Sequence, residues 1–326
     1  MMKNFFQSIV AILLALAVAS VSATPAYPNK VVRIVVPYPP GGPFDTLLRA
    51  LAHDLSEKWK QPVIIDNRPG ANESIGANVV AKSPADGYTL LASSESGIMM
   101  NAFLFSKLSY NPNSDFAPVT RLVQVPMVLV TPADFPATTL KEFIAEVRRR
   151  SPNTVNYGSS GVGGATHLPL AMLAKENGLA MAHVPYKGAA PVLQAMLGGE
   201  VQLAAVAASV AEQYITSGRL RGLAVSAPAR LPSLPQVPTF SETGIKDVQA
   251  EFMVGLAAPV GTPNDIVERI ALDVKGVMSR VDFRVKYLAP FAFTPIASTP
   301  AEFRDWLGRN RPIQAERVKI SGAQLN

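Results

Sequence analysis

Two short segments of the sequence combine glycine with acidic or hydroxyl side chains in an order that suits anion binding. The first is Pro40-Gly41-Gly42-Pro43, which follows an apolar run at residues 31–36. Proline is favoured at the first position of a helix, and glycine is accepted just before it. The N–H groups of a first helical turn lack helical partners and lie at the positive end of the helix dipole. The segment therefore predicts either an anion site or a tight connection that holds no ligand.

Two side chains beside this turn each allow two interpretations. Asp45 could satisfy the N–H groups of the helix start, or it could meet an ammonium group of a ligand. Phe44 could wall a pocket, or it could pack on Tyr38. The residue types alone leave both alternatives open at each position.

The same design recurs in the middle of the chain, in the segment Ser159-Ser160-Gly161-Val162-Gly163-Gly164-Ala165-Thr166-His167. A strand-like run precedes the segment, and a helix over 166–177 is expected after it. Its glycines match half of a dinucleotide-binding fingerprint, but the third glycine is missing, which disfavours a nucleotide. His167 could contact a ligand, cap the helix or pack internally. The two glycine-rich turns, one in each half of the chain, could face each other across a cleft.

The motifs of common enzyme classes are missing from the sequence. There is no G-x-S-x-G nucleophile elbow, no phosphate-binding P-loop and no cysteine. The histidines at 53, 167 and 183 lack the spacing of metal ligands. We therefore expect a protein without a metal ion, a cofactor or a catalytic step. The absence of cysteine also excludes disulfides and a lipid-anchored cysteine.

Short β-branched runs alternate with amphipathic segments along the chain. Strands are expected at 31–36, 62–66, 88–92, 123–131, 154–157, 183–186, 201–208, 220–226 and 252–259. Helices are expected at 75–82, 166–177, 190–197, 211–217 and 264–278, after Thr139 and Thr299, and from Pro43, where Leu47, Leu51, Leu55 and Trp59 form one apolar face. This alternation predicts an α/β fold with a largely parallel, doubly wound sheet. Ligands of such sheets bind beyond the carboxyl ends of the strands, where the loops at 38–42 and 93–97 are expected.

Length and composition fit a globular protein of two domains. The chain has 326 residues, of which 48% are hydrophobic, and a net charge of +6. The densest basic run, Arg148-Arg149-Arg150, is expected at a helix end, where cations suit the dipole, and no nucleic-acid motif accompanies it. We therefore expect no nucleic-acid partner and a mild positive field that favours small anions.

The first residues have the pattern of a secretion signal. Lys3 supplies a positive charge, residues 9–19 are apolar, and Val21-Ser22-Ala23 provides the small residues of a cleavage site. The apolar run is too short to span a bilayer. We expect residues 1–23 to be removed after Ala23 and the mature protein to be soluble in the periplasm.

Short motifs follow one another over almost the whole mature chain. They are Tyr27-Pro28, Pro37-Tyr38-Pro39-Pro40-Gly41-Gly42 with Asp45, Asp66-Asn67-Arg68-Pro69-Gly70-Ala71, Asp86-Gly87-Tyr88-Thr89-Leu90, Tyr157-Gly158-Ser159-Ser160-Gly161 with His167-Leu168, His183-Val184-Pro185-Tyr186-Lys187-Gly188, Leu234-Pro235-Gln236-Val237-Pro238-Thr239 and Ala258-Pro259-Val260-Gly261-Thr262-Pro263. Each motif is weak alone. In this order the set resembles the extracytoplasmic solute receptors of tripartite tricarboxylate transporters, often called the Bug family.

The resemblance implies a type II periplasmic-binding-protein fold, in which two doubly wound α/β domains enclose a ligand cleft. Residues 24–125 plus 250–326 would form the first domain and residues 126–249 the second, with crossovers near Val125 and Gln249. The implied ligand is a small carboxylate held by backbone amides and hydroxyl groups, which suits the glycine-rich helix starts. The implied ligand-binding residues are Tyr38, Gly41, Gly42, Phe44, Asp45, Ser93, Ser94, Ser159, Ser160, Gly163, Gly164, Thr166, His167, Tyr186 and Lys187.

The sequence departs from the family pattern at three places. Phe44 stands where a small hydroxyl residue is common, which motivates the hypothesis of a bulkier or aromatic monocarboxylate in place of a dicarboxylate. Asn72-Glu73-Ser74 replaces a more glycine-rich turn and is expected at the surface. Ala171 stands near a frequent acidic position, so one polar contact in the cleft or between the domains is expected to be missing.

The resemblance implies a monomeric receptor that closes on a small organic carboxylate and delivers it to membrane subunits of a tripartite tricarboxylate transporter. Closure would be a hinge motion of the two domains around the ligand. Two alternatives stay open. One is a sensor that reports ligand occupancy to a membrane kinase, and the other is an enzyme on the same scaffold.

Overall fold

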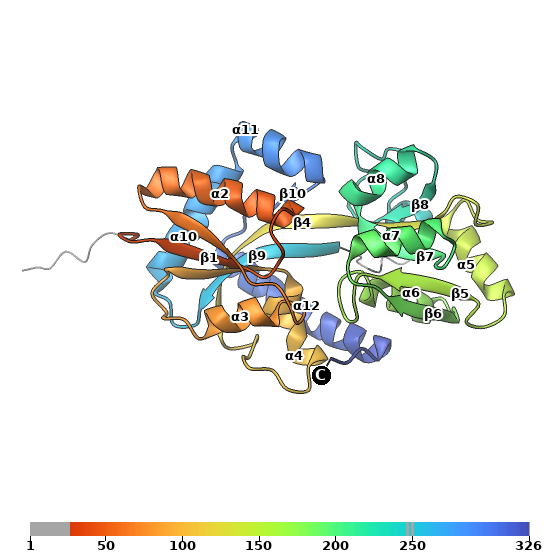
Figure 1. Cartoon of the computed structure of the whole chain (residues 1–326), viewed down its shortest axis with the longest axis horizontal. Coiled ribbons are helices and arrows are strands. Elements are labelled where there is room, and N and C mark those ends of the chain that lie inside the picture. The colour runs from red at the N-terminus through yellow and green to blue at the C-terminus, as the bar shows by residue number, and fades with distance from the viewer. Residues whose placement is uncertain (1–26, 246–247, 249–250, 326) are drawn as a thin grey trace, which may run out of the picture.

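The computed structural model describes residues 27–245, 248 and 251–325, which form two halves that lie side by side (Figure 1). The first half begins with β1 (Val32–Val36), α2 (Pro43–Trp59), β2 (Val63–Asn67), α3 (Ser74–Ala81), β3 (Thr89–Ser93), the π-helical turn η1 (Ser96–Met100) and α4 (Asn101–Leu104). It ends with β9 (Glu251–Pro259), α10 (Asn264–Met278), α11 (Val281–Phe283), η2 (Arg284–Leu288), η3 (Ala289–Phe291), β10 (Thr294–Pro295) and α12 (Pro300–Ser321).

The second half is reached through the long strand β4 (Phe116–Pro132). Its other elements are α5 (Leu140–Arg149), β5 (Val155–Ser159), α6 (Leu168–Glu176), β6 (Met181–Pro185), α7 (Ala189–Leu197), β7 (Leu203–Ala207), α8 (Ala208–Thr216), β8 (Leu220–Val225) and α9 (Phe240–Thr243). The final helix α12 contacts both α4 of the first half and α6 of the second.

Both halves have the same strand order. It is β2-β1-β3-β9-β4 in the first half and β6-β5-β7-β4-β8 in the second. In each half three neighbouring strands are parallel, and the next strand is antiparallel to both of its neighbours. This antiparallel strand is β9 in the first half and β4 in the second, and both are long strands that run to the boundary between the halves (Figure 1). The expected doubly wound α/β arrangement is therefore confirmed, but the sheet is mixed and not largely parallel, because all pairings of β4 and β9 are antiparallel.

Strand β4 belongs to both sheets. It pairs with β9 over Phe116–Pro126 and with β7 and β8 from Met127 onward. Pro126 lies where the partner changes, and a proline fits there because it has no N–H to donate to a ladder. Val125, near which the first crossover is expected, immediately precedes it. Gln249, near which the second is expected, lies outside the described residues.

Apolar side chains on the two faces of each sheet form the cores. Helix α2 covers one face of the first sheet through Leu47, Leu51 and Leu55, which have no exposed surface, so the predicted apolar face of this helix is confirmed. Helices α3, α4 and α12 cover the other face. In the second half, α5 and α6 cover one face and α7 and α8 the other. Each fully buried leucine of this kind contributes about 1.5–3 kcal/mol to the free energy of unfolding.

Several expected bounds differ from the structure, among them the start of α8, which lies at Ala208 and not at 211. The loop expected at 93–97 turns at Ser96 into η1, because Ile98 and Met100 are buried against the first sheet. Helix α6 starts at Leu168 and not at Thr166, whose hydroxyl instead accepts a hydrogen bond from the Ser160 N–H inside the loop. Strand β4 starts earlier than expected because its pairing with β9 begins at Phe116.

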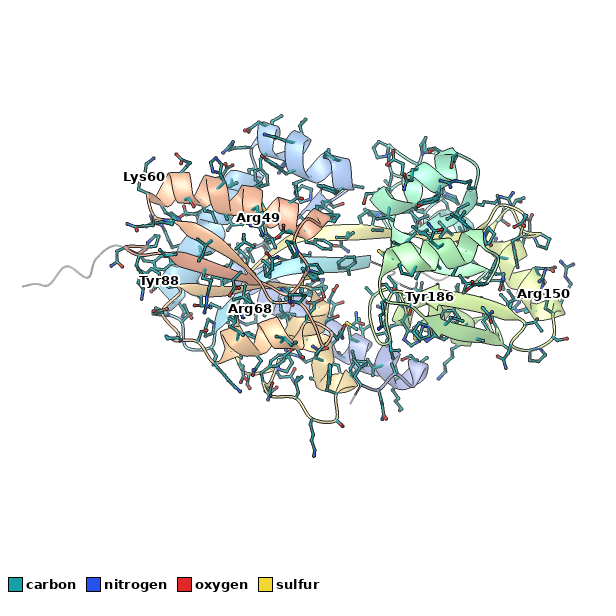
Figure 2. All side chains as sticks on the ribbon, viewed as in Figure 1. Arg49, Lys60, Arg68, Tyr88, Arg150 and Tyr186 are labelled. Carbon is teal, nitrogen blue, oxygen red and sulfur yellow. The ribbon has the colours of Figure 1, made fainter. Side chains whose placement is uncertain are left out.

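The basic run ends helix α5, as predicted. Arg149 and Arg150 form ion pairs with Glu146, and Arg148 donates to the carbonyl oxygen of Asn177. Arg150 and Lys60 lie at opposite ends of the molecule (Figure 2). The basic side chains are thus spread over the molecule and partly paired.

The signal peptide expected at residues 1–23 lies outside the described residues. Of the helices that are described, none combines the length and the apolar character needed to cross a membrane.

Candidate functional site

The turn between β1 and α2 starts the helix without a side-chain cap. Gly42 precedes the helix, and Gly41 has a φ of 87°, a left-handed conformation that glycine adopts without strain. The Asp45 carboxylate closes the turn by accepting hydrogen bonds from the Gly41 N–H at 2.9 Å, Arg49 Nε at 2.8 Å and Asn67 Nδ2 at 2.9 Å. Burial raises the pKa of Asp45, but these hydrogen bonds outweigh burial and hold the pKa below its ordinary value. Asp45 is therefore an ionised residue that positions the turn.

Phe44 packs on Tyr38, as one of its two interpretations predicts. The two ring centroids are 5.2 Å apart, and Phe44 also stacks on Phe293 and meets Phe252 edge-on, both at 5.4 Å. Phe44, Tyr38 and Phe252 keep some exposed surface. These four rings, which we call the aromatic wall, line the side of the glycine turn.

Glu73 joins this region although the sequence analysis did not place it there. Its carboxylate accepts hydrogen bonds from the Tyr38 hydroxyl at 3.0 Å, from the Ser94 N–H at 3.0 Å and from the hydroxyls of Ser93 and Ser94. Asn72, Glu73 and Ser74 are partly exposed, but the Glu73 carboxylate points inward, which the expected surface position did not include. The backbone there is left-handed, with a φ of 72° at Glu73, and this turns the side chain toward the carboxyl ends of β1 and β3.

The glycine-rich loop between β5 and α6 is tied by its own polar groups. The Ser160 N–H donates to Thr166 Oγ1 at 3.0 Å, and the Gly163 N–H donates to His167 Nδ1 at 3.0 Å. The Gly164 carbonyl oxygen accepts from the His167 N–H at 2.9 Å. One loop thus brings together the expected residues Ser159, Ser160, Gly163, Gly164, Thr166 and His167.

His183 reaches this loop from β6, and the sequence analysis did not assign it there. Its Nε2 lies 2.7 Å from Ser159 Oγ, and its ring stacks on His167 with 3.8 Å between centroids. Burial, and secondarily His183, lowers the pKa of His167 to about 4, and burial also lowers the pKa of His183. Both rings are therefore neutral near pH 7, and His167 carries its proton on Nε2 because Nδ1 accepts. The parallel pairing of β5 with β6 places His183 opposite Tyr157 and so beside the loop. This register could not be predicted from the residues next to His183 in the sequence.

Tyr186 and Lys187 follow β6. The Tyr186 N–H donates to the Ser159 carbonyl oxygen at 2.8 Å and so prolongs the pairing of β5 with β6. The Tyr186 hydroxyl donates to Glu200 at 3.3 Å beside α7 (Figure 2), and Lys187 is exposed. The Tyr186 side chain is thereby directed toward α7 and away from the His167 loop.

The glycine-rich loop of the second half touches the first half. Val162 packs in the apolar cluster that contains Leu104. A Cβ atom on Gly163, whose φ is 77°, would lie 2.4 Å from Leu104 Cδ2. Ala171, where a polar contact was expected to be missing, is buried in α6. Glycine at 163 is therefore required both by the backbone and by the neighbour across the boundary.

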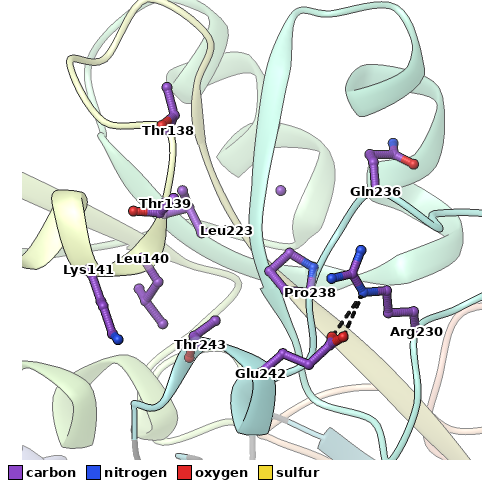
Figure 3. A pocket seen from close by; sticks show the side chains of 11 residues that line it. Thr138, Thr139, Leu140, Lys141, Leu223, Arg230, Gln236, Pro238, Glu242 and Thr243 are labelled. Carbon is purple, nitrogen blue, oxygen red and sulfur yellow. Dashed lines mark hydrogen bonds and ion pairs between the residues drawn. The ribbon is translucent and has the colours of Figure 1, made fainter.

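A pocket of about 400 Å³ lies in the second half, away from these turns (Figure 3). Thr139 and Lys141 line it together with Arg230 and Glu242, whose side chains are joined by hydrogen bonds of 2.9 and 3.0 Å. None of the expected ligand-binding residues lines this pocket. Within the described parts of the chain, no cluster of three or more histidine or acidic side chains is placed to hold a metal ion.

Comparison with known proteins shows the family of the chain that carries these two glycine turns. The family described as tripartite tricarboxylate transporter family receptor matches residues 47–307. The chain belongs to this receptor family. Protein BugT of Bordetella pertussis (strain Tohama I) is 32% identical to the receptor over 320 residues, which cover 98% of each chain.

Two solved structures have the same fold. The periplasmic binding protein BugD is 30% identical, with a TM-score of 0.75 over 91% of this chain and 99% of that one. The R. palustris protein Rpa4515 with adipate is 31% identical, with a TM-score of 0.80 over 92% of this chain and 100% of that one. The receptor therefore has the expected type II periplasmic-binding-protein fold of two doubly wound α/β domains. It is a solute-binding receptor of the Bug type.

Proposed function

We propose that this receptor captures a small organic carboxylate between its two domains and delivers it to a tripartite tricarboxylate transporter in the membrane. The observation that carries the proposal is the pair of glycine-rich helix starts at the carboxyl ends of β1 and β5. Helix α2 has no side-chain cap, so N–H groups of its first turn remain for a carboxylate. In α6 the N–H groups of Leu168 and Leu170 already donate to carbonyl oxygens, so the donors of the second turn would come from the loop before the helix. Uncharged donors bind a carboxylate less tightly than cationic side chains do, which suits a receptor that must release its ligand again. Adipate in the related Rpa4515 makes carboxylates the first class to test.

We assign residues 24–125 plus 250–326 to the first domain and residues 126–249 to the second. Two observations support this division. In the first half, the buried residues of the two apolar clusters come from positions before Met127 and from Met253 onward, and Leu168 is the exception. In the second half, the buried residues of both clusters lie between Met127 and Val248. Strand β4 changes partners at Pro126. Closure on a ligand would then bend the chain near this proline.

We further infer that residues 1–23 are removed after Ala23 and that the mature receptor acts as a monomer in the periplasm. The positive, apolar and small-residue regions of this segment support export. Membership of a transporter-receptor family supports a role next to membrane subunits.

The receptor is proposed to bind its ligand without turnover. Ser159 Oγ and His183 Nε2, 2.7 Å apart, resemble a nucleophile and its base. Ser159 has no exposed surface, however, and its hydroxyl donates to the Gly161 carbonyl oxygen at 2.9 Å. A substrate could not reach this oxygen without a rearrangement of the loop.

A thermal-shift screen of the mature receptor tests the proposal. The protein is first unfolded and refolded to remove any ligand that co-purifies. The panel contains aliphatic and aromatic monocarboxylates, dicarboxylates, amino acids and, as a neutral control, sugars. A ligand at a hundredfold excess over its Kd adds about 2.7 kcal/mol to the free energy of unfolding, because it binds only the folded state.

A higher melting temperature with one carboxylate class and none with sugars is the expected result. No shift with any carboxylate would overturn the proposal. Delivery has its own test, because cells that lack the receptor should lose uptake of the same acid. Unchanged uptake would contradict delivery and favour a sensor.

A further inference from the structure

The Glu73 carboxylate is held by a complete set of uncharged donors. Oε1 accepts from the hydroxyls of Tyr38 and Ser94, and Oε2 accepts from the Ser93 hydroxyl and the Ser94 N–H. A carboxylate offers about four lone-pair sites, so these four donors saturate it. Burial holds the pKa of Glu73 above its ordinary value, although the hydrogen bonds from these donors favour the charged form and oppose this shift. The donors thus form an anion position that the receptor fills with its own side chain.

The turn that carries Glu73 has an unfavourable backbone conformation. Ala71, Asn72 and Glu73 have φ values of 44°, 48° and 72°, and none of them is glycine. A left-handed residue with a side chain costs on the order of 1 kcal/mol. Such strain persists only where the surroundings hold it, and it is found most often at functional sites.

Asn101 holds this turn in place. Asn72 Nδ2 donates to Asn101 Oδ1 at 2.9 Å, and Asn101 Nδ2 donates to the Asn72 carbonyl oxygen at 2.8 Å. Asn101 has no exposed surface and also donates to the Tyr110 hydroxyl at 3.1 Å. The fold therefore fixes the direction of Glu73 at the expense of local strain.

Apolar surface lies next to the polar donors of this carboxylate. Tyr38, which donates to Glu73, contacts Phe44 in the aromatic wall. The wall is partly exposed at Tyr38, Phe44 and Phe252. A ligand that lies along the wall would find apolar surface beside a saturated negative charge.

Given the proposed function, on which this inference rests, we propose that Glu73 is a specificity-determining residue that restricts the ligand to a monocarboxylate with an uncharged, apolar or aromatic body. A second carboxylate at the Glu73 position would meet a like charge and find its donors occupied. A ligand ammonium would find no free lone pair on Glu73. The single carboxylate of the ligand is then left to the amides of the glycine turns.

The variant Glu73→Gly tests the anion position without any knowledge of the ligand. Glycine suits a φ of 72°, so the substitution removes strain while it frees the four donors. Millimolar acetate should then raise the melting temperature of Glu73→Gly relative to sodium chloride at equal ionic strength. The effect of acetate should be larger in Glu73→Gly than in the wild type or in Glu142→Gln, a control that removes an exposed carboxylate in the first turn of α5 in the other domain. Lack of an acetate effect on Glu73→Gly would overturn the anion position.

Ligand selectivity is the second test. Calorimetric titration compares the pairs hexanoate with adipate and benzoate with terephthalate, which differ by one carboxylate. The wild type should prefer the monocarboxylate of whichever pair binds. In Glu73→Gly and Glu73→Gln the affinity ratio should move toward the dicarboxylate by roughly tenfold or more, since the like charge is gone. Glu142→Gln should leave the ratio unchanged.

The outcomes separate this inference from the proposed function. A wild type that binds both members of a pair equally, with the same ratio in both Glu73 variants, overturns the specificity role while the receptor function stands. No binding of any carboxylate by any of the proteins overturns the proposed function and the specificity role with it. Glu73→Gln keeps the side-chain volume, so it decides the result if Glu73→Gly does not fold.

Discussion

One buried side chain positions each glycine turn, and the two side chains, Asp45 and His167, differ in charge. Asp45 is ionised and accepts from Gly41, Arg49 and Asn67. His167 is neutral and accepts from the Gly163 N–H. Each turn therefore has one buried side chain that fixes its backbone, and the remaining amides stay available to a ligand.

Acid should destabilise the receptor through His167. The pKa is about 4 in the folded protein against 6.5 in an exposed histidine, so the unfolded chain takes up the proton first. The free energy of unfolding should therefore fall as the pH drops from 6.5 toward 4, by up to about 3 kcal/mol. Urea denaturation across this range measures the effect.

The variant His167→Asn keeps an acceptor near Nδ1 and should show a shallower decline with acid than the wild type. His53→Asn, at an exposed position of α2, should keep the wild-type decline. The raised pKa of Glu73 increases the free energy of unfolding as the pH falls, which is opposite to the effect of His167. Glu73 is present in all three proteins, so its effect cancels in the comparison. Equal slopes in His167→Asn and the wild type would contradict the assignment.

At the scale of elements, threonine caps mark helix starts that the sequence predicted. Thr299 accepts from the Glu302 N–H at 3.2 Å, and Glu302 accepts from the Thr299 N–H at 2.8 Å, which completes a capping box. Thr139 Oγ1 accepts from the Glu142 N–H in the same way at 3.2 Å, and the Glu142 carboxylate accepts from the Thr138 N–H at 2.7 Å. The helices α2 and α6 at the glycine turns have no such cap.

Thr299→Ala should lower the free energy of unfolding by about 1 kcal/mol, because it removes the cap of α12. Thr216→Ala is a matched control, since the Thr216 hydroxyl donates to the carbonyl oxygens of Glu212 and Gln213 within α8 and caps no helix start. Urea denaturation should show a clear loss for the first and little change for the second. Equal losses would mean that the cap contributes nothing specific.

At the scale of the whole molecule, the two domains meet through more than β4 and β9. Helix α12 contacts α6, and the loop at Gly163 packs against Leu104 of α4. These contacts lie beyond the hinge strands. They favour the arrangement of the domains that the structure shows, and a change at Gly163 should alter that arrangement.

Gly163→Ala should destabilise the contact between the domains. Gly178→Ala is the control, since Gly178 has a φ of 62° but no atom near the position of an added Cβ. Each variant should lose about 1 kcal/mol from its left-handed backbone. Gly163→Ala should lose more because of Leu104, and its radius of gyration by small-angle X-ray scattering should increase. Indistinguishable variants would show that the contact does not hold the domains.

Local sequence determined the strand–turn–helix units and the helix starts. The apolar period from Leu47 to Trp59, Gly42 before Pro43, and Thr299 with Glu302 depend on residues within one or two helical turns of each other. The loop at 159–167 was recognisable for the same reason. Its polar residues contact one another across a few positions of the chain.

Only the tertiary structure decided which distant groups meet at the turns. His183 stacks on His167 because β5 and β6 pair in parallel with one particular register. Glu73 points inward because a left-handed turn is clamped by Asn101 and because its donors come from residues 38, 93 and 94. Turn chemistry in the sequence shows that the chain reverses direction there. Which side a turn residue faces depends on long-range packing, and no local pattern contains that information.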